Sequence, residues 1–154
     1  MVLLSSVCLV ADTLQEPGWL FQYEISVRGR GIYPQLCPKP QIFSSNINDL
    51  CISAITVFEL EYGAAKSSWG ERTRQKLAMF LAPFTILPFT TDDAICAGKL
   101  RGHLEKQGTP IGPYDVQIAA QGLSRGITII THNVKEFSRV QNLDLEDWLA
   151  PHSI

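Results

Sequence analysis

The chain has 154 residues, enough for one compact domain and too few for two of ordinary size. Apolar residues make up 45% of the chain and charged residues 18%, which excludes an intrinsically disordered protein. The formal net charge is −2, so the chain lacks the basic field of a protein that coats nucleic acid regardless of sequence. No apolar run approaches the ~20 residues of a membrane span, which excludes an integral membrane protein.

The cysteines indicate reduced thiols in a cytoplasmic protein. Cys8, Cys37, Cys51 and Cys96 form no C-x-x-C pair and only three histidines accompany them, so a structural zinc site is not expected. Disulfides are the less favoured alternative. The apolar N-terminus has no lysine or arginine before it, which argues against a cleaved secretory signal.

Residues 1–42 and 43–154 differ in character. The first stretch holds four of the nine prolines and the run VRGRGIYPQLCPKPQ, which has neither helical nor strand periodicity. We therefore expect an atypical and irregular N-terminal segment, followed by an ordered domain over residues 43–154.

From residue 43 onward, short apolar runs alternate with amphipathic stretches. Strands are predicted over residues 50–53, 84–89 and 127–131. Helix starts are predicted at Ser53, at the Ser68–Glu71 capping box, at the acidic run 90–93 and at Pro113. The expected helix ends lie near Ala65, Pro83, Gln107 and Arg125, and a helical turn over 133–137 and a closing element over 143–149 follow.

This alternation predicts an α/β domain with a mostly parallel sheet. In such sheets the chemistry lies at the carboxyl ends of the strands. Asp115 is the most informative residue there, because it follows Gly112, Pro113 and Tyr114 and so occupies the first turn of a helix, where a charged carboxylate is favoured. Such a carboxylate suits Mg²⁺ or Mn²⁺, although an acidic residue that only stabilises the helix start is the alternative.

Glu59 is the second candidate. It is two residues from Glu61, so the two carboxylates point to different sides of one helix, and one of them should face inward. An inward carboxylate needs a cation or a metal as its partner. The alternative is that both lie on the flanks of an exposed helix. Ser53 and Thr56 are close to Glu59 along the chain and can hold water near it.

Asn133 is the third candidate, since it follows the end of a predicted strand. Its amide can orient a metal-bound water or cap the next helical turn, and capping is favoured from this residue alone. His132 beside it is an exposed loop histidine with no assigned role. No serine-hydrolase elbow, dinucleotide-binding or Walker pattern is present. What remains is a carboxylate-rich α/β domain, and carboxylates that converge on one divalent ion are typical of phosphodiester hydrolysis.

Three stretches of the sequence closely resemble the VapC toxins, the PIN-domain ribonucleases of bacterial VapBC toxin–antitoxin modules. In order and spacing, they are CISAITVFELEYGAAKS, GTPIGPYDVQIAAQGLSRGITIITHNVKEFSRV and LEDWL, within residues 43–154. The resemblance implies a small α/β/α sandwich with a parallel sheet. It also implies RNA cleavage with Mg²⁺ or Mn²⁺ held by acidic residues, and tRNA is the implied substrate because relatives with these motifs cut initiator tRNA.

The resemblance also assigns residues and partners. It places Glu59 and Asp115 as catalytic residues and metal ligands, and Asn133 as the last catalytic position. The implied partner is a VapB-type antitoxin that blocks the site, and the toxin would reach operator DNA only through that antitoxin. A homodimer is the implied oligomer.

The N-terminus departs from the family pattern. Family members begin with a short apolar strand that ends in Asp-Thr-Asn, and that aspartate is a primary metal ligand, but residues 1–42 do not contain this sequence. The nearest imitation is Asp12, which is followed by Thr13 and Leu14 and lies 47 residues before Glu59, farther than usual in the family. We therefore expect a replaced N-terminus, through a frameshift or a misassigned start, with residues 2–11 able to serve as a substitute strand. Because one carboxylate is missing, weak or absent nuclease activity is predicted.

Two other functions stay open at the level of sequence. One is a catalytically inactive VapC remnant that retains antitoxin binding. The other is an unrelated small α/β binding domain, which a fold without a parallel sheet would favour. Local basic patches can bind RNA phosphates, although each can equally be a solvated helix face. The patches are Lys99, Arg101 and Lys106 on one predicted helix, and Lys135 and Arg139 near another.

Overall fold

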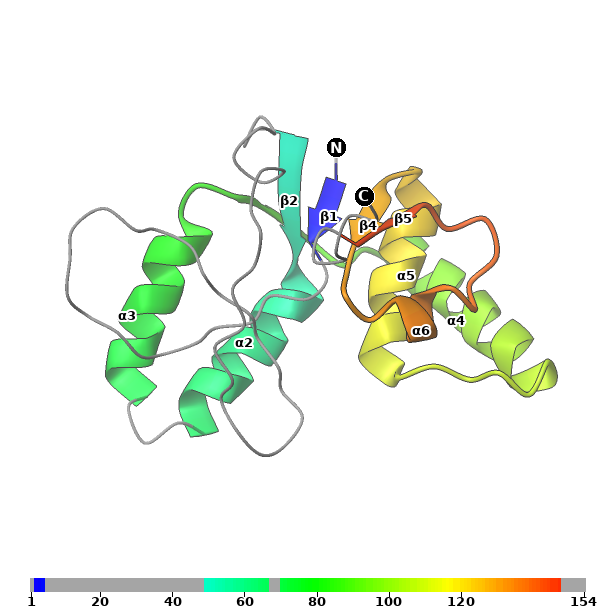
Figure 1. Cartoon of the computed structure of the whole chain (residues 1–154), viewed down its shortest axis with the longest axis horizontal. Helices are drawn as coiled ribbons and strands as arrows, with labels where there is room; N and C mark the ends of the chain where they lie inside the picture. The colour runs from blue at the N-terminus through cyan, green and yellow to red at the C-terminus, as the bar shows by residue number, and fades with distance from the viewer. Residues whose placement is uncertain (1, 5–48, 67–69, 148–154) are drawn as a thin grey trace, which may run out of the picture.

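The computed structural model describes residues 2–4, 49–66 and 70–147. Short parallel strands and longer helices alternate along the chain (Figure 1). The strands are β1 (Val2–Leu4), β2 (Leu50–Ser53), β3 (Thr85–Leu87), β4 (Thr128–Ile130) and β5 (Leu145–Glu146). The helices are α2 (Ala54–Lys66), α3 (Gly70–Leu81), α4 (Thr91–Lys106), α5 (Pro113–Arg125) and α6 (Val134–Phe137).

The five strands form one sheet in the order β3-β2-β1-β4-β5, and every pair is parallel. The central strand is β1, in which Leu3 pairs with Cys51 of β2 on one side and with Ile129 of β4 on the other. The mostly parallel α/β architecture expected from the sequence is therefore confirmed, and a strand within residues 2–11 fills the centre of the sheet.

The strand at Val2–Leu4 refines the expectation of an irregular N-terminus. Leu3 is fully buried, as expected of a residue in the central strand of a sheet that is covered on both faces. Asp12 and most of residues 1–42 lie outside the described residues, as does the Ser68 end of the expected capping box. The proposal that this N-terminus is a replacement stays a prediction.

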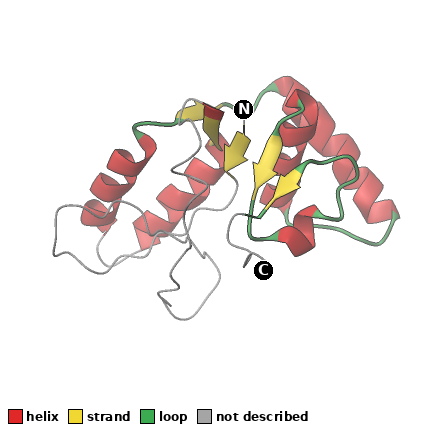
Figure 2. Cartoon of the chain, turned by 45° about the horizontal axis from the view of Figure 1, so that its top comes forward, coloured by secondary structure: helices red, strands yellow, loops and turns green. Residues whose placement is uncertain are grey.

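Helices cover both faces of the sheet, which gives the α/β/α sandwich (Figures 1 and 2). Residues that pair across the sheet form a row and point to the same face. One such row belongs to the core that α4, α5 and α6 cover: Leu3, Cys51 and Ile129. The next row contributes Ile52 and Ile130 to a second core, which α2 and α3 cover. Successive strand residues point to opposite faces, so a strand that is apolar throughout, such as residues 127–131, has to be covered on both.

The local signals place the element ends well. Ser53 caps α2, because its Oγ accepts a hydrogen bond of 3.0 Å from the Ile55 amide. Gly126 ends α5 with φ +60°, a left-handed conformation that glycine adopts without strain. Strand β3 is shorter than the predicted 84–89, because Pro88 has no amide hydrogen with which to continue the ladder. Within the described ranges, no helix has the length and apolarity needed to cross a membrane.

Candidate active site at the carboxyl edge of the sheet

Two hydroxyl residues mark the carboxyl ends of the strands on either side of β1. The register aligns Leu4 with Ile52 in β2 and with Ile130 in β4, so Ser53 and Thr131 each lie one residue beyond a partner of Leu4. Both hydroxyls turn the chain in the same way. The Ser53 Oγ accepts from the amide two residues later, and the Thr131 Oγ1 accepts from the Asn133 amide at 3.0 Å.

Asp115 is the third residue of α5 and is half-buried. The helix begins at Pro113, and Gly112 at the N-cap has no side chain to satisfy the amides of the first turn. The positive end of the helix dipole therefore acts on the Asp115 carboxylate and favours its charged form. This is the placement predicted from the Gly-Pro-Tyr-Asp sequence.

Glu59 is half-buried on α2, one residue before the buried Leu60. Glu61 is exposed on another side of the helix and forms an ion pair with Arg74 of α3, with 3.4 Å between Oε2 and Nε. The prediction that one carboxylate faces solvent and the other faces inward agrees with these exposures. Glu59 is thus the less exposed of the two carboxylates.

An aromatic contact brings these two helices together, although they belong to different layers of the sandwich. The rings of Phe58 on α2 and Tyr114 on α5 lie with their centroids 5.4 Å apart. Glu59 follows Phe58 and Asp115 follows Tyr114 in the chain, so the contact brings the two acidic segments to the same edge of the sheet. This convergence could not be read from sequence spacing.

Asn133 stands at the N-cap of α6, three residues beyond β4, and is half-buried. Its side chain makes no capping hydrogen bond, so the capping role favoured from the sequence is not used. The hydroxyl of Thr131 turns the chain at this point instead. His132 is exposed, and its Nδ1 lies 3.1 Å from an oxygen of Asp147.

Thr56 lies one helical turn before Glu59 and is 2% exposed. Its Oγ1 is the only buried side-chain oxygen or nitrogen among the described residues without a hydrogen-bond partner. A buried hydroxyl without a partner costs about 1–3 kcal/mol, so such an atom points to an absent ligand or water. It supports the sequence interpretation that Thr56 holds water close to Glu59.

The donors at this edge fit a hard divalent cation only in part. In residues 2–4, 49–66 and 70–147, no three acidic, histidine or cysteine side chains form a group able to hold a metal. Mg²⁺ is often held by one or two carboxylates, with water and substrate phosphate completing its shell. Glu59 and Asp115 are the two carboxylates that the sequence predicts for such an arrangement. The residue after β1 is Ser5 rather than an aspartate, so the strand itself delivers no third carboxylate.

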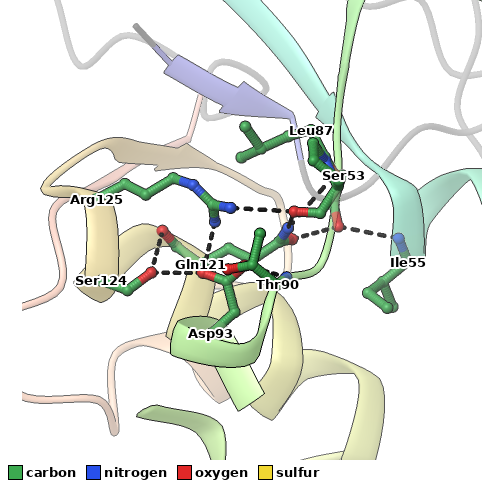
Figure 3. Close-up of polar contacts among 9 residues, drawn as sticks. Ser53, Ile55, Leu87, Thr90, Asp93, Gln121, Ser124 and Arg125 are labelled. Carbon is green, nitrogen blue, oxygen red and sulfur yellow. Dashed lines mark hydrogen bonds and ion pairs between the residues drawn. The ribbon is translucent and has the colours of Figure 1, made fainter. Parts of the chain in front are cut away.

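A buried polar network holds α5 against the ends of β2 and β3 (Figure 3). Gln121 is fully buried on α5, and its Oε1 accepts a hydrogen bond of 2.5 Å from the Ser53 hydroxyl. Its amide nitrogen donates to the carbonyl oxygens of Leu87 and Pro88 at 3.4 and 3.1 Å. Gln121 thus fixes the helix that carries Asp115 to the strand that leads into the Glu59 helix.

Asp93 is the second centre of this network and is 1% exposed. It accepts hydrogen bonds from Ser124 and Arg125 at 2.6 Å each, and from the Thr90 amide and hydroxyl at 2.7 and 2.9 Å. Burial alone would raise the pKa of Asp93, but the hydrogen bonds from Ser124, Thr90 and Arg125 outweigh it and hold the pKa below its usual value. The carboxylate therefore stays charged and ties α4 to α5.

Sequence reasoning missed this network. The 90–93 run was interpreted only as an acidic helix start, which is correct for Thr90 but omits the contacts of Asp93 with α5. A signal for Gln121 did exist, because it is a polar residue within a buried helical run, Ile118 to Gly122. Such a residue must find buried partners.

The expected basic patches are partly neutralised. Arg101 pairs with Glu105 at 2.8 Å, and Arg139 pairs with Glu136 at 3.3 Å. Arg139 also donates to the Pro110 carbonyl oxygen at 2.8 Å. These two arginines therefore already have partners within the chain, which leaves less charge for phosphates on these surfaces.

Comparison with known proteins agrees with this fold. The family model described as PIN domain matches residues 39–143. The chain is 42% identical to the tRNA(fMet)-specific endonuclease VapC of Salmonella typhimurium over 69% of its own length and 80% of that protein. It is 40% identical to Ribonuclease VapC2 of Haemophilus influenzae, over 70% of this chain and 81% of that one.

Solved structures give the same result. The structure of DNA-bound VapBC from Salmonella typhimurium matches 64% of this chain and 75% of that chain, with a TM-score of 0.63 and 42% identity. VapBC-1 from nontypeable Haemophilus influenzae matches 70% of this chain and 82% of that chain, with a TM-score of 0.65 and 34% identity. The fold and the family model together define a PIN-domain protein. Within that class, the chain belongs to the VapC family of ribonucleases from toxin–antitoxin systems.

Proposed function

We propose that this chain is the toxin of a type II toxin–antitoxin system and a Mg²⁺-dependent endoribonuclease. Its proposed substrate is RNA, and tRNA is the preferred RNA. The observation that carries the proposal is the meeting of α2 and α5 at the Phe58–Tyr114 contact, which brings the segments of Glu59 and Asp115 to one edge of the sheet. Mn²⁺ is the alternative cation. The tRNA preference is taken from the Salmonella relative, which is named a tRNA(fMet)-specific endonuclease.

The roles of the residues follow from their chemistry. Asp115 and Glu59 would hold the cation, and Asn133 would orient water at the neighbouring strand end. When bound, the cation neutralises the phosphate and lowers the pKa of a coordinated water. Asp115 is held charged by the α5 dipole, and Gln121 keeps α5 in place against Ser53.

The proposal includes the partners and the compartment. A VapB-type antitoxin would cover the site and carry the complex to operator DNA, in line with the DNA-bound VapBC structures of Salmonella typhimurium and Rickettsia felis. The toxin would form a homodimer in the cytoplasm.

A specific observation favours a second candidate, a catalytically inactive VapC remnant that still binds its antitoxin. Strand β1 ends at Leu4, and the next residue, Ser5, is not the aspartate that the family resemblance implies after the first strand. The described residues also contain no group of three potential metal ligands. Asp12 is eight residues beyond the end of β1, so the strand would not position it directly. The activity of the chain as written should therefore be weak.

The first experiment measures metal binding and RNA cleavage together. Purified full chain is titrated with Mg²⁺ by calorimetry and incubated with tRNA, in parallel with Asp115→Ala, Glu59→Ala and the exposed control Asp92→Ala. The proposal expects slow cleavage that stops in EDTA and in both site variants, while the control cleaves like the parent. Cleavage that persists in Asp115→Ala would refute the assigned site.

The second experiment separates the two candidates. Ser5→Asp restores a carboxylate directly after β1, with Ser5→Asn as a matched control of the same size and no charge. If the chain is a weakened nuclease, Ser5→Asp should tighten Mg²⁺ binding and raise the cleavage rate at least tenfold, about 1.4 kcal/mol of transition-state stabilisation, while Ser5→Asn does neither. If no variant cleaves RNA but the chain still binds a VapB-type antitoxin, the remnant is the correct assignment.

A further inference from the structure

Three aromatic rings form an exposed row beside the acidic edge. Phe58 and Tyr62 of α2 are each 50% exposed, and Tyr114 of α5 is 40% exposed. The Phe58 ring lies 5.4 Å from that of Tyr114 and 6.5 Å from that of Tyr62. Burying such rings is favourable, so three together on the surface indicate a face that meets a ligand.

The geometry of the row suits flat ligands. The planes of Phe58 and Tyr62 differ by only 13°, so a planar group stacked on one of these rings lies nearly parallel to the other. The Tyr114 ring is tilted by 59° to that of Phe58 and meets such a group at an angle. At the Tyr62 end, the Lys66 Nζ lies over the Tyr62 ring, 5.1 Å from its centroid, which places a cation beside the rings. A row of rings with a cation at its end matches the alternating bases and phosphates of a single strand.

The row also has the right position. Phe58 precedes Glu59 on α2, and Tyr114 precedes Asp115 on α5, so the rings and the candidate carboxylates belong to the same two helix segments. Gly63, one turn beyond Glu59, has open space around the position that a Cβ would take, so the helix backbone is accessible there. A strand of RNA with its phosphate at the carboxylates would place the neighbouring bases along the rings.

We propose that Phe58, Tyr62 and Tyr114, with Lys66, form a stacking platform for unpaired bases of RNA next to the cleavage site. The proposal rests on the proposed function for its choice of nucleic acid over protein. It explains how a chain with a net charge of −2, whose Arg101 and Arg139 are already paired, binds an anionic polymer. Stacking supplies affinity without a basic field, and duplex RNA offers no free bases to the rings.

The test measures binding without cleavage. Full chain is titrated in EDTA against a short fluorescein-labelled single-stranded RNA, the same RNA as a duplex, and an abasic ribose-phosphate strand of equal length. Phe58→Leu keeps an apolar side chain but removes the ring, Tyr114→Leu does the same on α5, and Tyr114→Phe keeps the ring. Met79→Ala on α3, where the side chain is 70% exposed, is the matched control for loss of exposed apolar surface.

We expect each ring-to-leucine change to weaken single-strand binding about 5- to 150-fold, while Tyr114→Phe and Met79→Ala bind like the parent. Duplex and abasic strands should bind weakly and respond little to these changes. Lys66→Gln should lower the dependence of affinity on salt by about one phosphate contact. These results would support the platform even if the chain never cleaves RNA.

Unchanged single-strand affinity in the Phe58→Leu, Tyr114→Leu double variant would overturn the proposal, even where tRNA cleavage supports the proposed nuclease. Equal affinity of the parent chain for the abasic strand would also overturn it. The third contrary result is that the ring changes alter only self-association in sedimentation experiments, which would make the face a contact between copies of the chain.

Discussion

The Asp93–Arg125 pair offers a quantitative test of the network behind the site. The change is Asp93→Asn, which keeps the size of the side chain and removes its charge. In the native chain the two carboxylate oxygens of Asp93 accept four hydrogen bonds, two at each oxygen. An amide has one acceptor oxygen, so one pair of donors would face an NH₂ group.

The expected cost follows from burial. Asp93 is 1% exposed and the Arg125 side chain 22%, so the arginine loses its counter-charge in a largely water-excluded position. Breaking one partner of a buried pair costs about 3–5 kcal/mol. Arg125 keeps its hydrogen bond of 3.0 Å to the Pro88 carbonyl and some contact with water, which favours the lower end, about 3 kcal/mol. For a chain of this length that corresponds to a loss of about 6–12 °C in Tm.

The assay is urea unfolding followed by circular dichroism, with Asp92→Asn as the control. Asp92 is the exposed neighbour of Asp93, and its change should stay within about 0.5 kcal/mol. An Arg125→Met variant and the double variant complete a cycle, in which we expect a coupling free energy of about 1–3 kcal/mol. A loss of unfolding free energy below about 1 kcal/mol for Asp93→Asn would refute the stabilising role of the buried pair. A zero coupling free energy between Asp93 and Arg125 would refute it as well.

The pH dependence of the unfolding free energy is a second test of the role of Asp93. The folded pKa of Asp93 lies below its unfolded value, so its contribution to stability is fully present above the unfolded pKa, about 3.9. That contribution is lost as the pH falls through the folded pKa. The stability difference between the parent and Asp93→Asn should therefore be constant from neutral pH to about pH 5 and shrink below about pH 4. If the stability difference between the parent and Asp93→Asn stayed constant at acidic pH, it would contradict the lowered pKa of Asp93.

Three further substitutions test the packing, each measured by thermal and urea unfolding. Gly122→Ala should destabilise the chain by about 1–3 kcal/mol, because its Cβ would lie 2.8 Å from Leu143 Cδ1 and 2.9 Å from Ile129 Cδ1 in the core. The control is Gly98→Ala on α4, where the added Cβ meets open space, and it should stabilise the chain by about 0.5–1 kcal/mol. Equal effects of Gly122→Ala and Gly98→Ala on stability would argue against the packing of α5 on β4. Leu3→Ala should cost about 2–5 kcal/mol, since Leu3 is fully buried in the central strand, and a neutral result would remove β1 from the sheet.

Much of the C-terminal domain could be predicted from local sequence. Pro113 and Gly126 bracket α5 as expected, and the acidic run after Phe89 starts α4 at Thr91. Fixed φ at proline and left-handed freedom at glycine act within a few residues, so the sequence carries them directly. The Gly-Pro-Tyr-Asp order likewise placed Asp115 in a first helical turn.

The members of the candidate site stay a prediction from the sequence, and their surroundings were only partly predictable. Glu59 and Asp115 follow from motif and helix position, whereas the capping role considered for Asn133 is replaced by the Thr131 hydroxyl. The contacts of Gln121 and Asp93 could not be inferred, because they join segments more than thirty residues apart. Their geometry depends on how helices pack, which no local pattern encodes.

The sequence by itself determined the alternation of strands and helices, the element ends and the family, because periodicity, caps and motif order are local properties of the chain. Only the tertiary structure decided that Val2–Leu4 lies between β2 and β4, and that α2 and α5 meet at the Phe58–Tyr114 contact. Parallel strands pair across long connections, and the energy of that pairing comes from burying both faces of the sheet at once. The centre of the sheet and the acidic edge therefore exist only once the whole domain has packed.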